Sequence, residues 1–151
     1  MSAQYKPVIW NKNKLIYDAV LIAAVVIYIL TFVRLVPMLL PAGTDVDHAI
    51  RRMNAFGTCA FLMLTFILCI GPLARLDTRW LPLLYNRRHF GVMTCLVALI
   101  HASYVMGWYY AYSEIDPYVA LFSINTSFTR LVGFPFELFG VFALAILVLL
   151  A

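Results

Sequence analysis

The sequence predicts an all-α integral membrane protein with four transmembrane helices. Of its 151 residues, 64% are hydrophobic and 12% are charged, whereas about a quarter of the residues in a typical soluble domain are charged. The mean hydropathy is +0.91. The apolar residues form four runs, each near the length that crosses a bilayer as a helix, and most charges lie between these runs. Contact with a lipid bilayer therefore follows from composition.

The first span is predicted over residues 15–34, after a polar, cytoplasmic segment over residues 1–14. A signal peptide is the alternative, but its apolar region usually has about 7–15 residues and ends at a small-residue cleavage site. This run is longer and ends at Arg34, so we expect a retained helix. The second span, over residues 53–73, has small residues around Gly57. They would let a neighbouring helix or a flat cofactor approach closely.

The third span is predicted over residues 89–110 and the fourth over residues 134–151. The long connection between them is apolar and aromatic, and we expect it to lie on the membrane surface or against the bundle. The fourth run barely reaches the hydrocarbon thickness, and no polar anchor follows Ala151. We therefore expect a chain truncated at its C-terminus, holding the first part of a six-helix or larger bundle.

The distribution of lysine and arginine predicts the orientation. Seven basic residues lie before the first span or after the second, against four elsewhere. The positive-inside rule then places the N-terminus in the cytoplasm, although Arg51 and Arg52 oppose this assignment. The basic residues on the richer side are Lys6, Lys12, Lys14, Arg75, Arg79, Arg87 and Arg88.

The net charge and the cysteines exclude other classes of function. The formal net charge is +4, but the basic residues form short clusters between apolar runs, which is typical of cytoplasmic loops and does not indicate nucleic acid. Cys59, Cys69 and Cys95 all lie in apolar spans without a CxxC pair, so we interpret them as packing residues. No constellation for hydrolysis or group transfer is present.

His101 is the main candidate functional residue, because an ionisable group in the middle of an apolar span needs a partner. That partner is another polar group, a metal ion or a haem iron, which a neutral imidazole can bind in a water-free site. Ala98, Ala102 and Thr94 lie near its face of the helix and would leave room for a porphyrin edge. They would equally suit close helix packing.

The two other histidines are weaker candidates. His89 lies twelve residues before His101, which corresponds to about 18 Å along a helix and about 120° around it, so the two do not share a face. Arg87 and Arg88 beside it favour an interfacial group, with cofactor binding as the second interpretation. His48 is interpreted as a solvated loop residue.

Residues 52–151 also resemble the first half of the ferric reductase-like transmembrane domain family of membrane haem proteins. The matching motifs are Gly-Pro-Leu-Ala-Arg-Leu at 71–76, Asn-Arg-Arg-His-Phe-Gly at 86–91 and Leu-Ile-His at 99–101. The resemblance implies a cell-membrane location, the inner membrane in bacteria, and b-type haem held between histidines on two helices. His101 matches one such ligand.

The resemblance also implies partners. No histidine follows His101, so the second axial ligand would lie beyond Ala151 or on another membrane subunit. Electrons would be exchanged with a redox partner protein or domain.

Two functions remain open at this stage. The first is a membrane electron-transfer protein, an oxidoreductase component of ferric reductase-like type, that relays electrons through haem b bound via His101. The second is a non-catalytic membrane subunit or anchor of a larger complex, without cofactor, in which His101 is hydrogen-bonded inside the bundle. Transport is less consistent with the sequence, because Asp18 and Glu137 lie toward helix ends rather than at the midplane.

Overall fold

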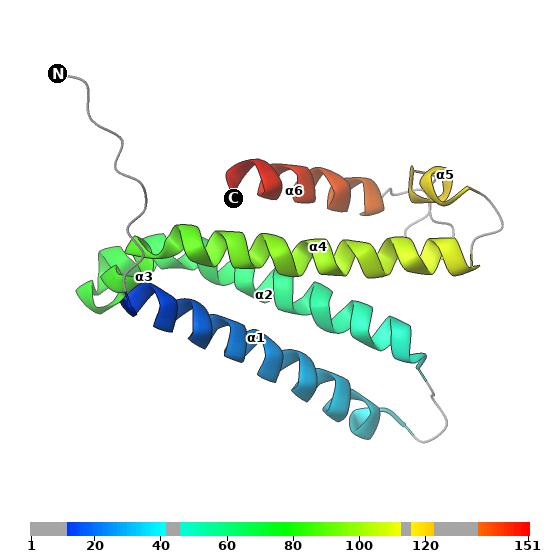
Figure 1. Ribbon diagram of the computed structural model, residues 1–151, viewed down its shortest axis with the longest axis horizontal. Coiled ribbons are helices and arrows are strands. Elements are labelled where there is room, and N and C mark those ends of the chain that lie inside the picture. The colour runs from blue at the N-terminus through cyan, green and yellow to red at the C-terminus, as the bar shows by residue number, and fades with distance from the viewer. Residues whose placement is uncertain (1–11, 42–45, 113–115, 123–135) are drawn as a thin grey trace.

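The computed structural model describes residues 12–41, 46–112, 116–122 and 136–151, and this described part is helical without strands (Figure 1). The predicted all-helical class is therefore confirmed. The elements are α1 (Lys12–Leu39), α2 (His48–Leu76), a 3₁₀ turn η1 (Thr78–Trp80), α3 (Leu81–Tyr85), α4 (Arg87–Tyr112), α5 (Pro117–Phe122) and α6 (Phe136–Leu150).

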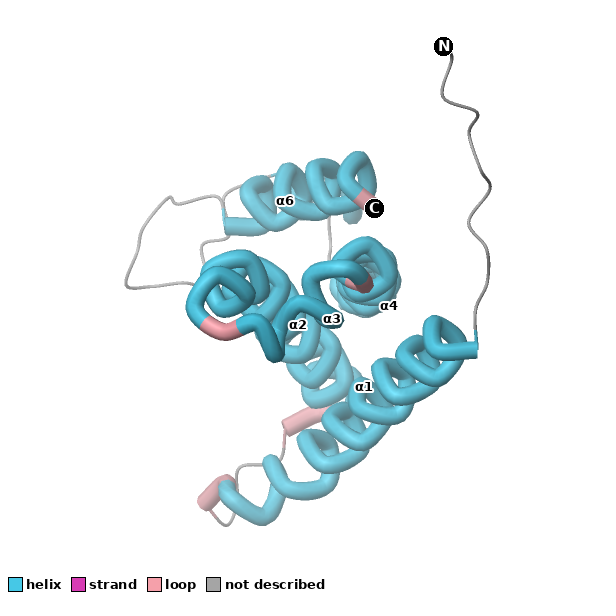
Figure 2. Tube along the Cα trace, turned by 90° about the vertical axis from the view of Figure 1, so that its left-hand side faces the viewer, coloured by secondary structure: helices cyan, strands magenta, loops and turns pink. Residues whose placement is uncertain are grey.

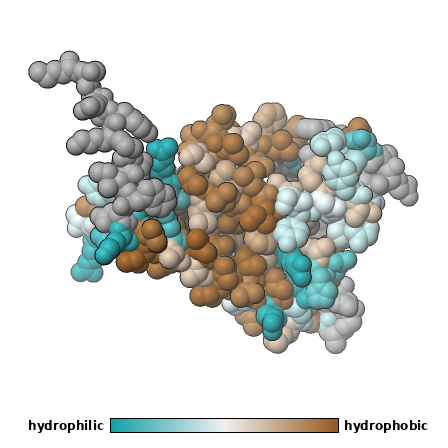
Figure 3. Space-filling view, in the orientation of Figure 1, coloured by the Kyte–Doolittle hydropathy of each residue, from teal (hydrophilic) through white to brown (hydrophobic). Residues whose placement is uncertain are grey.

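Three of these helices, α1, α2 and α4, are long and apolar enough to cross a membrane. They have 28, 29 and 26 residues, which at a rise of about 1.5 Å per residue exceeds a hydrocarbon core of about 30 Å. Figure 3 shows a wide hydrophobic band between two more polar ends of the molecule. The protein is thus a multi-pass membrane protein, as predicted.

The predicted fourth span, over residues 134–151, contains α6, which has 15 residues. Its length is about 22 Å, less than the hydrocarbon thickness. The described residues therefore provide three helices of spanning length where the sequence predicts four. α6 nevertheless lies beside α4 and runs in the opposite direction (Figure 1).

The helices extend past the predicted ends of the apolar runs. Asp47 caps α2, because its carboxylate accepts a hydrogen bond of 2.7 Å from the Ala49 amide. At the other end, the Asp77 amide donates to the Leu73 carbonyl at 2.9 Å, so α2 continues past Pro72. Pro37 similarly lies near the end of α1. Each proline removes one backbone hydrogen bond, and only a few residues of the helix follow it.

The core lies where α1 and α4 pack against α2 (Figure 2). Its buried residues are Cys59, Met63 and Ile67 from α2, with Phe90 and Val97 from α4. Because lipid tails are as apolar as these side chains, shape and close packing stabilise the contact more than burial of apolar surface does. The free cysteines Cys59 and Cys95 are buried, which agrees with the predicted packing role, whereas Cys69 is exposed on the apolar surface.

Candidate functional site

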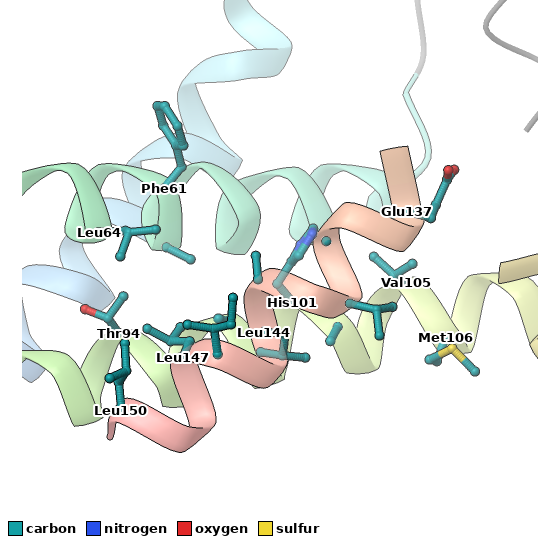
Figure 4. A pocket seen from close by; sticks show the side chains of 17 residues that line it. Phe61, Leu64, Thr94, His101, Val105, Met106, Glu137, Leu144, Leu147 and Leu150 are labelled. Carbon is teal, nitrogen blue, oxygen red and sulfur yellow. The ribbon is translucent and has the colours of Figure 1, made fainter. Parts of the chain in front are cut away.

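A cavity of about 750 Å³ lies between α2, α4 and α6 (Figure 4). Its volume falls within the range of roughly 300–1,000 Å³ that is usual for ligand and cofactor sites. The lining is almost entirely apolar. Small residues from all three helices keep the space open: Ala60 on α2, Ala98 and Ala102 on α4, and Gly140 and Ala143 on α6.

His101 is half-buried and lines this cavity from α4. Its ring nitrogen Nδ1 lies 2.9 Å from the Met53 carbonyl oxygen on α2. A carbonyl only accepts hydrogen bonds, so Nδ1 carries the proton and donates it. In the neutral imidazole the other nitrogen, Nε2, then keeps its lone pair. His101 thus contacts a polar group on a neighbouring helix, which is one of the alternative partners considered from the sequence.

Gly57 allows the His101 ring to lie directly against α2. A Cβ atom added at Gly57 would come within 2.8 Å of Cε1 and 2.9 Å of Nδ1 of His101. Ordinary contacts between such atoms are about 3.5–4.0 Å. Next to this contact, the rings of Phe56 and Tyr104 stack with centroids 5.6 Å apart. Glycine at position 57 is therefore a steric condition for the hydrogen bond between His101 and Met53.

A carboxyl group lines the same cavity from α6. Glu137 lies in the first turn of this helix, and the Tyr109 hydroxyl of α4 donates a hydrogen bond of 3.2 Å to its Oε1. From the sequence, Glu137 is only a charge near a helix end, and its pairing with Tyr109 is not predicted. An acidic residue that opens an otherwise apolar helix is the signal that could have identified it.

The Thr94 hydroxyl in the cavity wall already forms a hydrogen bond with the backbone. Thr94 is fully buried, and its hydroxyl donates to the Phe90 carbonyl at 2.9 Å. Such a bond to the residue four positions earlier keeps the hydroxyl close to its own helix. His101 and Glu137 are therefore the titratable side chains that the cavity lining presents.

The other two histidines lie elsewhere. Nδ1 of His89 is 3.2 Å from Oδ2 of Asp18 on α1, and both side chains are 23% exposed. This pair connects α1 to α4 near one end of the bundle. His89 does not line the cavity. His48 is the exposed first residue of α2. The structure brings His101 to the cavity and leaves His89 and His48 outside it.

Within the part of the chain that the structure describes, no group of three or more His, Cys, Asp or Glu side chains lies close enough together to hold a metal ion. A haem needs no such cluster, because its porphyrin supplies four of the iron ligands and the protein supplies only the axial ones. A single histidine that lines an apolar cavity is thus compatible with haem ligation.

The family comparison covers the helices that form this cavity. The family described as "Ferric reductase like transmembrane component" matches residues 56–151, which include α2 from its third turn onward, α4 and α6. No curated protein matches the chain, and no solved structure does. The match covers well over half of the sequence and contains both His101 and the cavity around it. The chain belongs to the ferric reductase-like transmembrane component family.

Proposed function

We propose that this protein transfers electrons within the membrane through a b-type haem bound by His101, as a component of an oxidoreductase. The observation that carries the proposal is the hydrogen bond from His101 Nδ1 to the Met53 carbonyl. Histidines that bind metals almost always donate their other ring N–H to a carbonyl or carboxylate, which fixes the tautomer and the ring orientation. His101 has this arrangement, and its ring lines a cavity of cofactor size.

The residues present fit a haem. The cavity walls are apolar, and the alanines and glycines around His101 leave space where larger side chains would fill it. His101 would be one axial ligand through Nε2. When bound, the haem iron would supply one-electron chemistry by alternating between its ferric and ferrous states. The protein residues would hold the group, exclude water and set its electrostatic surroundings.

The second axial ligand would come from outside the cavity wall described above. Met106 lines the cavity, but it follows His101 by five residues on the same helix and so would not reach the opposite face of a haem that His101 binds. No histidine follows His101 in the sequence. We propose that a second histidine is contributed by another membrane subunit or by chain beyond residue 151, within a bundle of six or more helices in which α6 is a further membrane helix.

The proposed orientation has the N-terminus in the cytoplasm of a cell membrane, the inner membrane if the cell is bacterial. It is supported by the start of α1, the connection after α2 and the start of α4, which lie together at one end of the bundle (Figure 1). This end carries Lys12, Lys14, Arg75, Arg79, Arg87 and Arg88. Its positive charge would suit the cytoplasmic face and would be available to an acidic redox partner.

The alternative function is a membrane subunit or anchor without cofactor. One observation favours it: the Met53 carbonyl already provides His101 with a hydrogen-bond partner on a neighbouring helix. In that case the hydrogen bond from the imidazole would stabilise the packing of α4 against α2. The volume of the cavity beside the ring favours the haem proposal, since a purely structural histidine needs no such space.

The reduced-minus-oxidised absorption spectrum of the purified protein separates the two functions. For the wild type we expect a b-type spectrum, and for His101→Ala we expect its loss, because the substitution removes the ligand. His48→Ala is the control, since His48 is exposed at the start of α2 and does not line the cavity. Haem that persists unchanged in His101→Ala, or a wild type without haem, would reject the electron-transfer proposal.

A further inference from the structure

The cavity that contains His101 also contains a carboxyl group with no role in binding the iron. Glu137 is the acidic member of the cavity lining within the described residues. It lies in the first turn of α6, where the free amide groups of the helix favour negative charge. Although Glu137 lies toward a helix end, it lines the cavity, and carboxyl groups that face the interior of a membrane bundle commonly mark paths along which protons move.

The groups around Glu137 come from the two helices packed against α6, which are α4 and α5. From α4, the Tyr109 hydroxyl donates to Glu137 Oε1 at 3.2 Å. Near α5, Asp116 and Tyr118 are exposed, and the Tyr118 ring packs against Tyr110 with centroids 6.3 Å apart. The Tyr109 hydroxyl is therefore the group that holds the carboxyl in place from α4.

The position of the pair along α4 connects the cavity with the polar end of the bundle. Tyr109 follows His101 by eight residues, which is about 12 Å along the helix toward its C-terminal end at Tyr112. Exposed polar side chains, including Asp116, follow that end. Glu137 thus lines the cavity on the side between His101 and the aqueous surface that α4 reaches.

We propose that Glu137 is the proton-exchanging group of this cavity and takes up one proton when the haem on His101 is reduced. This inference rests on the proposed function. A one-electron reductant adds one electron to the iron, and the Glu137 carboxylate gains one proton from water at the nearby surface and becomes a neutral acid. The Tyr109 hydroxyl keeps its own proton throughout. The negative charge of the added electron and the positive charge of the added proton cancel. The net charge of the cavity therefore stays the same, which avoids the high cost of placing an unbalanced charge in apolar surroundings.

The test is the midpoint potential of the haem in the purified, haem-loaded full chain, measured by dithionite titration between about pH 4 and pH 9, a range that begins near the ordinary carboxyl pKa of about 4.3 and extends above it. We expect the wild-type potential to fall as the pH rises. Glu137→Gln is expected to abolish this dependence, because the amide cannot be protonated in this range. Asp18→Asn is the matched control, since Asp18 bonds His89 outside the cavity, and it should keep the wild-type dependence.

A second variant tests the same assignment with the carboxyl group still present. Tyr109→Phe removes the hydrogen bond to Glu137 Oε1 but leaves the carboxyl group in place. The pH dependence should therefore remain. If Glu137→Gln retains the wild-type pH dependence, or Tyr109→Phe abolishes it, the inference is overturned while haem binding stands. Absence of haem from the wild type would instead overturn the proposed function and the inference with it.

Discussion

Gly57→Leu is expected to reduce bound haem at least about tenfold, equivalent to about 1.4 kcal/mol of binding free energy. The new side chain would begin at a Cβ atom only 2.8 Å from the His101 ring. Either the ring must leave the Met53 carbonyl or α2 and α4 must separate. Both outcomes would misplace the ligand nitrogen. Haem content per chain, measured as the pyridine haemochrome of purified protein, checks this expectation.

Gly71→Leu is the control for this steric effect. Gly71 lies on the same helix, and a Cβ atom added there meets nothing within 4 Å. The substitution changes the same residue type to the same side chain without contacting His101. We expect nearly wild-type haem content. Equal haem content in Gly57→Leu and the wild type would show that the contact between Gly57 and His101 is irrelevant to the cofactor.

Ala98→Phe is expected to displace haem by filling the cavity while leaving His101 in place. Ala98 lines the cavity one helical turn before His101, and a phenyl ring there would occupy space that the porphyrin needs. We expect loss of most of the bound haem, again about tenfold or more. Because the ring adds apolar surface to an apolar space, the helical content by circular dichroism should not change.

Leu99→Phe provides the comparison for Ala98→Phe. Leu99 is the next residue of α4 and is 43% exposed on the apolar outer surface. A larger side chain there would contact lipid and not the cavity. It should leave haem content unchanged. If both variants keep their haem, the cofactor does not occupy the cavity between α2, α4 and α6.

The broad architecture of this protein could be predicted from its sequence because hydrophobicity alone decides whether a helix enters a membrane. The three long helices coincide with the first three apolar runs. The ends of these helices were predicted less accurately. The first two spans were predicted to end at residues 34 and 73, yet α1 continues to Leu39 and α2 to Leu76, and Pro37 and Pro72 lie inside these helices.

The candidate site could be predicted only in part. His101 stood out as the one ionisable group in the middle of an apolar span. Its partner did not, because the Met53 carbonyl is a backbone group and carries no signature in the sequence. The small residue that makes room for the ring, Gly57, was noticed, but its specific contact with His101 depends on how α2 packs against α4. The link between Tyr109 and Glu137 likewise depends on where α6 lies.

The central claim, that the imidazole of His101 binds the haem, is tested most directly by His101→Gly with and without added imidazole. The substitution leaves a space beside Met53 that free imidazole can enter. The proposed function predicts that His101→Gly loses the b-type absorption spectrum and that imidazole together with haem restores it. Full haem content and an unchanged spectrum in His101→Gly without imidazole would contradict the claim.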